Sequence, residues 1–295
     1  MEFIDTYKEL KTNIPAGFRD KVRGLSLDIL SNAYGILHRL DDLFRTPRVQ
    51  FLYIHHVFKD EEEALTRLMQ SLSRHHTFIS HSEGVRRVLQ GDIDKPYISI
   101  SSDDGLKNNV DAAAILHSFG AQSCFFICPS IIGETDAEKL GRFSAERLHF
   151  PPVEFMDWKD VNTLLRQGHE IGGHTMSHVN IAATGLPALH GEISTCHEII
   201  KARCGSADHF AFPYGRFKDF TEPARQLVYR SGFTSCASAQ RGCHIAGRKL
   251  RPEDLLIRRD HIILAWPLRH ILFFLARNAA QATENTNFYP VLCES

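Results

Sequence analysis

The sequence lacks two features that are typical of nucleic-acid-binding proteins and of membrane-spanning proteins, respectively. It has no excess of positive charge, since 34 Lys and Arg stand against 35 Asp and Glu, and a protein that binds nucleic acid carries a basic surface. It also lacks a long hydrophobic run, because Pro267, Arg269 and His270 interrupt the longest apolar segment, residues 261–276. A membrane-spanning helix needs about 20 apolar residues. We therefore expect neither a nucleic-acid partner nor a transmembrane segment.

Paired cysteine motifs are also absent. The seven cysteines are odd in number and contain no CxxC spacing, and the first residues, MEFIDTYKELKTN, are too charged for a signal peptide. We interpret the cysteines as reduced, mostly buried thiols of a cytoplasmic protein. Cys124 and Cys128, which flank a predicted strand, are expected to pack in the core and not to bind metal.

What the sequence does contain is an alternation of strand and helix signals without a low-complexity linker or an internal repeat. With 295 residues, 43% of them hydrophobic, the chain can fill one large α/β barrel. The alternation predicts a parallel sheet or barrel covered by helices. We expect strands over 49–57, 97–101 and 122–128, a short strand running into a loop over 169–178, and a strand and turn over 209–215. Helices are expected over 61–75, 108–120, 156–168, 189–205 and 221–232. Residues 1–48 lie outside this pattern and are predicted to be a helical extension of the domain formed by residues 49–295.

Two adjacent carboxylates, Asp103 and Asp104, end one predicted strand in the stretch YISISSDDGLKNN. Asp-Asp-Gly is good turn chemistry, so a simple turn is one interpretation. The pair also stands where a strand gives way to a helix, and in parallel α/β folds catalytic groups gather at that edge.

His174 and His178 could supply partners for these carboxylates. Their i, i+4 spacing in GGHTMSH puts both imidazoles within reach of one cation. With 17 histidines in the chain, some pair with this spacing is expected by chance. The two preceding glycines favour a metal site, because they would let backbone and cation approach closely. Two His and one Asp form a three-ligand site suited to Zn²⁺ or another divalent metal in hydrolysis.

Three ordered motifs, SSDDG (101–105), HTMSH (174–178) and FAFPYG (210–215), resemble the polysaccharide deacetylases, the carbohydrate esterase family with the NodB-homology domain. The resemblance runs from about residue 50 to 262, and FLYIHHV resembles the first strand of the branch that acts on poly-N-acetylglucosamine. It implies a distorted (β/α)₇ barrel and metal-dependent removal of an acetyl group from a saccharide. N-acetyl is expected over O-acetyl, in polysaccharide or glycoconjugate biosynthesis.

The resemblance also implies roles for individual residues. Asp104, His174 and His178 would hold the metal, which we expect to be Zn²⁺, with Ni²⁺, Co²⁺ or Mn²⁺ as alternatives. Asp103 would be the general base, and the backbone N–H of Tyr214 would stabilise the oxyanion. Phe212, Pro213 and Tyr214 would line the substrate groove.

The general acid and the positively charged partner of the base are less well defined by the resemblance. His55 aligns with the acid of the poly-N-acetylglucosamine branch, and His56 remains an alternative. Ala211 stands where other branches carry an arginine, so Arg258 or Arg259 is expected to supply that charge near the substrate. His261 is a further candidate for an acid, although a surface or core histidine is the simpler interpretation.

Two other functions fit the same motifs. One is an inactive, saccharide-binding member of the family, against which the intact Asp103 argues. The other is a hydrolase of a non-sugar carbon–nitrogen bond. The expected partner is an acetylated saccharide, such as a lipid-linked or nucleotide-linked intracellular precursor.

Overall fold

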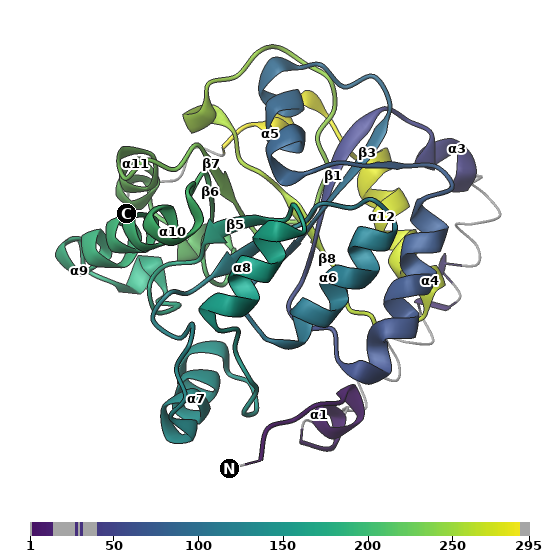
Figure 1. The fold of residues 1–295 in the computed structure, drawn as a ribbon. Helices are drawn as coiled ribbons and strands as arrows, with labels where there is room; N and C mark the ends of the chain where they lie inside the picture. Colours follow the sequence, from purple (N-terminus) through teal and green to yellow (C-terminus); the bar gives the residue numbers. More distant parts are fainter. Residues whose placement is uncertain (1, 14–26, 29, 32–39, 290–295) are drawn as a thin grey trace.

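A row of seven parallel strands forms the centre of the molecule in the computed structural model, which describes residues 2–13, 27–28, 30–31 and 40–289 (Figure 1). The strand order is β7-β6-β5-β4-β3-β1-β8, and the short β2 pairs with the start of β3. The strands are β1 (Arg48–Ile54), β2 (Thr77–Phe78), β3 (Pro96–Ser102), β4 (Cys124–Ile127), β5 (Glu170–Gly173), β6 (His209–Ala211), β7 (Ser235–Ala237) and β8 (Arg259–His261).

The two ends of this row meet and nearly close a barrel. Ala237 at the end of β7 forms a parallel bridge with Ile257, two residues before β8. The backbone N–H of Ser238 donates to the Ile257 carbonyl at 2.9 Å, and that of Ile257 donates to Cys236 at 3.2 Å. The predicted distorted (β/α)₇ barrel is confirmed.

Helices surround the barrel, as the alternation predicts (Figure 1). Their bounds are α1 (Tyr7–Asn13), α3 (Leu40–Phe44), α4 (Glu62–Leu72), α5 (His81–Gln90), α6 (Asn108–Ser118), α7 (Ala137–Phe143), α8 (Trp158–Arg166), α9 (Leu186–His190), α10 (Cys196–Cys204), α11 (Glu222–Arg230) and α12 (Leu268–Ala280). The helix expected over 189–205 is instead three consecutive pieces: the end of α9, a π-helical turn at Gly191–Thr195, and α10.

Local capping explains where two of these helices begin. The carboxylate of Asp157 accepts hydrogen bonds from the N–H groups of Lys159 and Asp160 at 2.7 and 2.8 Å, which makes it the N-cap of α8. The sequence analysis missed α5, although Ser80 caps its start and Gly91 ends it in a left-handed conformation. These are ordinary cap signals, so α5 could have been found from the sequence.

The interrupted apolar segment 261–276 turns out to span two elements. It contains the last residue of β8 and the first two turns of α12, which begins after Pro267. Ile271, Leu275 and Ala276 of α12 pack in one hydrophobic cluster with Leu52 of β1. Among the described helices, none combines the length and apolarity of a membrane-spanning segment. The segment therefore covers the barrel.

Of the predicted N-terminal extension, α1 and α3 are described, whereas residues 14–26, 29 and 32–39 lie outside the described part of the chain. The division at residue 48 stays a prediction. The six described cysteines are free thiols, all buried except the half-buried Cys204. Cys293 lies outside the described residues.

Strand register decides which side chains reach the barrel's interior. Tyr53 of β1 is paired with Ser101 of β3 on one side and with His261 of β8 on the other. Since side chains alternate along a strand, Arg259 and His261 share one face of β8 while Asp260 lies on the opposite face. The next residues along β1 and β3, just past the strand ends, are the histidines and aspartates singled out by the sequence.

Candidate active site

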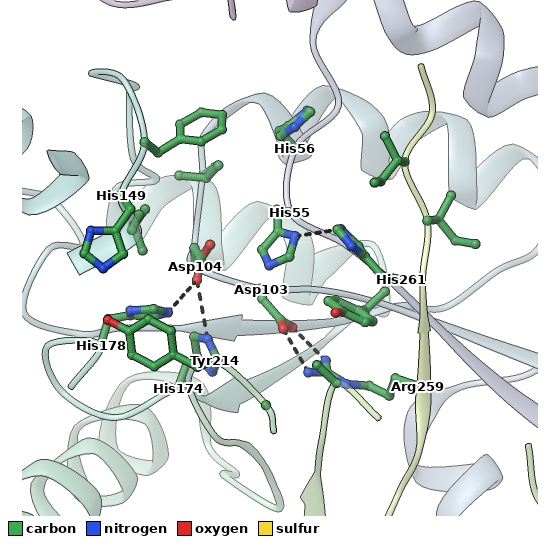
Figure 2. Close-up of a pocket in the computed structure, with 18 of the residues that line it drawn as sticks. His55, His56, Asp103, Asp104, His149, His174, His178, Tyr214, Arg259 and His261 are labelled. Carbon is green, nitrogen blue, oxygen red and sulfur yellow. Dashed lines mark hydrogen bonds and ion pairs between the residues drawn. The ribbon is translucent and has the colours of Figure 1, made fainter. Parts of the chain in front are cut away.

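The residues predicted to act in catalysis come together around one cavity of about 430 Å³ at the carboxyl ends of the strands (Figure 2). His55 follows β1, Asp103 and Asp104 follow β3, and His174 and His178 follow β5. Further walls come from the segment after β6 and from β8. A cavity of this size accommodates a small organic ligand.

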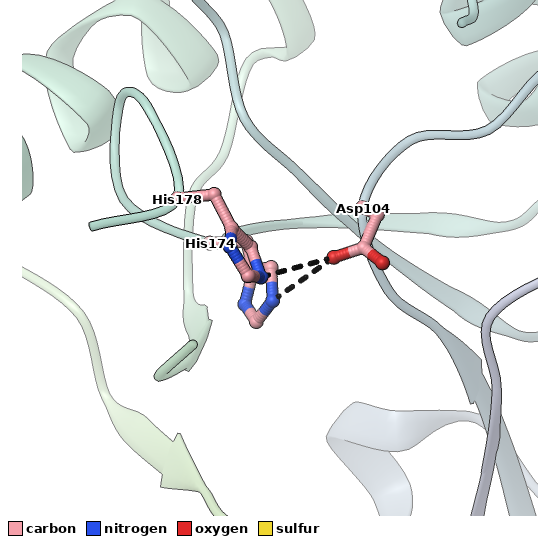
Figure 3. Close-up of side chains that lie close together, drawn as sticks. All are labelled: Asp104, His174 and His178. Atoms are coloured by element: carbon pink, nitrogen blue, oxygen red, sulfur yellow. Dashed lines mark ion pairs between the residues drawn. The ribbon is translucent and has the colours of Figure 1, made fainter. Parts of the chain in front are cut away.

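Asp104, His174 and His178 form a buried cluster that could hold a metal ion (Figure 3). Oδ1 of Asp104 lies 3.4 Å from Nε2 of His174 and 3.3 Å from Nε2 of His178, without hydrogen-bond geometry to either ring. One potential ligand atom from each residue lies within 4.8 Å of the others. Three ligand atoms thus converge on one point.

The hydrogen bonds behind the two imidazoles suit a cation. Nδ1 of His174 lies 2.7 Å from the Ala211 carbonyl, and Nδ1 of His178 lies 3.1 Å from the Arg147 carbonyl. A carbonyl can only accept, so each Nδ1 carries the hydrogen, and in a neutral ring Nε2 then presents a lone pair toward Asp104. Two nitrogen lone pairs and a carboxylate facing one point repel one another unless a cation lies between them. The residues present therefore fit a divalent metal.

The ionisation state of the Asp104 carboxyl is consistent with a role as a metal ligand. Burial alone would raise the pKa of this carboxyl, but interaction with His174 and His178 holds its pKa well below the usual range. Asp104 is therefore ionised at neutral pH and able to ligate a cation.

Gly172 and Gly173, which precede the histidines, have a packing role. A Cβ on Gly172 would lie 2.5 Å from the ring of Phe126, and one on Gly173 would lie 2.7 Å from the ring of Phe233. The glycines make room for these rings against β5. Their expected effect on the approach of a cation stays a prediction.

Asp103 points away from Asp104 and pairs with Arg259. The two carboxylate oxygens accept from Nη1 and Nη2 of Arg259 at 2.7 and 2.8 Å, a bidentate pair in which both residues are buried. Burial would lower the pKa of Arg259, but Asp103 outweighs it and raises the pKa. Nε of Arg259 donates to the Ser238 carbonyl at 2.9 Å, which fixes the guanidinium plane.

Of the two arginines left open by the sequence, only Arg259 lines the cavity. Nε of Arg258 donates to the Thr286 carbonyl at 3.2 Å, and its guanidinium lies over the ring of Phe217. Adjacent residues at the edge of a strand face opposite ways, so only one of the pair could enter the barrel.

His55 lies between the two aspartates and His261, as Figure 2 shows. Its Nδ1 is 3.0 Å from Nε2 of His261, and its backbone carbonyl accepts from Nδ2 of Asn109 at 2.7 Å. Burial lowers the pKa of His55, and the charges of Asp104 and Asp103 oppose that effect. His56 also lines the cavity, but its Nδ1 contacts Oε2 of Glu61 at 2.8 Å. His261 also lines this pocket, and its candidacy as an acid stays a prediction.

The FAFPYG segment contributes Phe212 and Tyr214 to the cavity wall, whereas Pro213 is not among the lining residues. The Tyr214 hydroxyl donates to the Arg147 carbonyl at 3.2 Å, and its ring packs against His178. Within the described part of the chain, the backbone N–H of Tyr214 donates to no acceptor. A donor to an oxyanion must be free of other acceptors, and this N–H meets that requirement.

Unusual backbone conformations concentrate at this site. Five described residues other than glycine have positive φ: Asp104, His149, Thr175, His178 and Tyr214. Four of them line the cavity and the fifth follows His174. Such conformations are sparsely populated and persist where surrounding structure enforces them, which is common at functional sites.

The sequence analysis missed several lining residues. Tyr7 and Leu10 of α1 reach the cavity from the N-terminal segment, and Figure 1 places α1 at the same end of the molecule as α7. The N–H groups of Tyr7 and Lys8 donate to the carboxylate of Asp60 at 2.8 and 3.2 Å, which ties α1 to the loop after β1. No local pattern reveals such a contact between segments distant in sequence.

Comparison with known proteins gives a consistent result. Residues 90–234 match the polysaccharide deacetylase family. The fold resembles the deacetylase PplD of Streptococcus pyogenes in complex with acetate, at 16% identity and a TM-score of 0.61, over 77% of this chain and 98% of that one.

Two further solved structures are similar. IcaB from Ammonifex degensii has 16% identity and a TM-score of 0.56, over 78% of this chain and 98% of its own. A de-N-acetylase from Aggregatibacter actinomycetemcomitans has 17% identity and a TM-score of 0.61, over 77% of this chain and 99% of its own. At these identities the likeness establishes the shared fold.

Proposed function

We propose that this protein is a hydrolase that uses a divalent cation to remove an acetyl group from a saccharide. Its residues 90–234 match the polysaccharide deacetylase family, which acts on acetylated saccharides. The observation that carries the proposal is the convergence of Asp103, Asp104, His174 and His178 on one cavity. An N-acetyl group is the proposed target, because an amine leaves only with a proton and His55 can provide one. Biosynthesis of a polysaccharide or glycoconjugate is the proposed setting.

Asp104, His174 and His178 would hold the cation. Two imidazoles and one carboxylate match the donor set of Zn²⁺ sites with open positions, and Ni²⁺, Co²⁺ and Mn²⁺ accept the same donors. Such a cation would lower the pKa of a bound water toward about 7 and polarise the acetyl carbonyl.

The chain's own residues carry out the proton transfers. Asp103 takes a proton from the attacking water, using a carboxylate lone pair that Arg259 leaves free, and the water oxygen bonds to the carbonyl carbon. The Tyr214 N–H donates to the carbonyl oxygen as negative charge develops there. When the C–N bond breaks, its electron pair takes a proton from His55. Acetate and the free amine of the sugar result.

The proposal is tested by measuring acetate release from a panel of N-acetylated and O-acetylated saccharides, with chelator-treated and metal-reconstituted protein. We expect release from at least one N-acetylated saccharide, loss of that release after chelation, and recovery on adding a divalent metal. Undiminished release by protein shown to be metal-free would contradict the metal role. Absence of release from every acetylated saccharide by metal-loaded protein would contradict the function.

His55→Ala is expected to reduce turnover of an N-acetylated saccharide by about 10²–10⁴-fold, while turnover of an activated acetyl ester changes little. The reason is that an amine needs a proton to leave, whereas a phenolate does not. The measurement is kcat on both substrates at equal metal content.

His56→Ala is the matched control, because His56 is the neighbouring histidine in the same cavity but is engaged by Glu61. It should affect both substrates modestly and equally. A larger amide-specific loss for His56→Ala than for His55→Ala would transfer the acid role to His56.

We further propose that residues 49–295 form the catalytic domain and that residues 1–48 are an extension of it. Helix α1 of that extension would then complete one wall of the substrate pocket through Tyr7 and Leu10.

A further inference from the structure

His261 touches the proposed acid and has no role in the chemistry described so far. Its Nε2 lies 3.0 Å from Nδ1 of His55, within hydrogen-bond distance, and the two ring planes are nearly perpendicular at 87°. A single hydrogen can occupy the line between these nitrogens, so one ring donates and the other accepts. Which ring donates decides what His55 can do with its other nitrogen.

Strand pairing holds His261 firmly. Its register partner on β1 is Tyr53, and the two rings stack with centroids 4.7 Å apart and planes 18° apart. The N–H of the next residue, Ile262, donates to the Tyr53 carbonyl at 2.9 Å. His55, by contrast, lies just past the end of β1. A side chain fixed on a strand can therefore orient one that lies on a loop.

Charge around His261 favours the accepting role. Burial, the neighbouring His55 and His56 rings and the nearby Arg241 and Arg259 lower the pKa of His261 to about 2. His261 is thus a neutral ring that offers a lone pair. On the other side of His55 lie Asp103 and Asp104, which favour positive charge on that ring.

We propose that His261 is a positioning residue for His55: Nε2 of His261 accepts the hydrogen of His55 Nδ1 and so directs His55 Nε2, with its proton, toward the leaving nitrogen. This inference rests on the proposed function, since it concerns the acid of that reaction. In the transfer the proton passes from His55 Nε2 to the amine, and His55 stays behind as the neutral Nδ1–H tautomer that His261 stabilises. His261 itself neither gains nor loses a proton.

Two substitutions separate the hydrogen bond from the packing. His261→Phe keeps an aromatic ring to stack on Tyr53 but removes the acceptor, whereas His261→Gln gives up the ring and keeps an acceptor oxygen near the position of Nε2. Loss of one hydrogen bond should make His261→Phe lower kcat for an N-acetylated saccharide by about 10-fold, with KM and the rate on an activated acetyl ester nearly unchanged. His261→Gln should recover most of that loss.

The same change made in a His55→Ala background distinguishes action through His55 from other roles. Because a positioning residue works only through its partner, His261→Phe should cause no further loss on the amide when His55 is absent. If His261→Phe lowered amide turnover by the same factor with and without His55, the proposal would be overturned. Equal losses on amide and ester would indicate a structural role, and a raised KM with unchanged kcat would indicate substrate binding. Either result also overturns it.

A readout independent of turnover keeps this inference separate from the proposed function. Nitrogen-15 NMR of the His55 ring should show hydrogen on Nδ1 in the parent protein and a mixture of tautomers in His261→Phe. If the parent protein releases no acetate but shows this tautomer change, the proposed function fails and the positioning contact stands. If acetate is released but the His55 tautomer is the same in both proteins, the positioning role fails alone.

Discussion

Asp103→Asn is expected to lower turnover by about 10²-fold or more while leaving the bound metal in place. The substitution preserves the shape of the side chain and removes the basic carboxylate. Asp103 faces Arg259, and Asp104 faces the two histidines, so loss of the Asp103 charge should not reach the metal ligands. Turnover and metal content measured on the same preparation check this expectation.

Stability must be measured alongside, because Asp103 is the partner of a buried charge. Arg259 is 1% exposed, and removing one member of a buried ion pair costs about 3–5 kcal/mol. Asn still offers one acceptor oxygen, so we expect a loss at or below the lower end of this range, seen as a lower denaturation midpoint. Turnover is then compared at a temperature where both proteins are folded.

Asp260→Asn is the matched control for a lost buried carboxylate. Asp260 is on the other face of β8, where it accepts hydrogen bonds from Gln50 and Asn278. This variant should lose stability yet keep most of its turnover. If folded Asp103→Asn turns over like the parent protein, Asp103 is not the base; if it stays active but loses metal, the roles of Asp103 and Asp104 are reversed.

Removing a metal ligand is expected to abolish both metal binding and acetate release. His174→Ala takes away one of three converging donor atoms, and the Nδ1 contact to Ala211 that orients it. For Asp104 and His178, whose φ angles are 75° and 53°, Asn is the better replacement because it tolerates positive φ. Elemental analysis of the purified variants is the measurement.

The fold should survive these three substitutions, since the barrel has its own hydrophobic core. Asp104→Asn retains a weak oxygen donor, so excess metal should restore part of its activity, whereas His174→Ala should not recover. Ser177, which lies between the two histidines and donates to Glu192, gives a control variant, Ser177→Ala, that should keep its metal. A ligand variant with stoichiometric metal would remove that residue from the proposed site.

Much of this site was predictable because each motif is local. Asp103 and Asp104 are adjacent, His174 and His178 are four residues apart, and each pair follows a segment with a recognisable strand pattern. In a parallel barrel the carboxyl ends of all strands meet at one end, so local motifs at those ends imply a shared pocket. The alternation of strands and helices that predicts the barrel is also a local pattern, so it is visible in the sequence.

The sequence by itself determined the barrel and the residue types at its carboxyl end; tertiary structure alone decided which of them meet. Arg258 and Arg259 are equivalent in a linear sequence, and only the register of β8 against β1 turns Arg259 inward to Asp103. The same register puts His261 beside His55, and packing of α1 adds Tyr7 to the pocket. Hydrophobic periodicity reports whether a residue faces inward or outward within its own element, but it contains no information on the offset between elements. That offset is set by long-range strand pairing and packing.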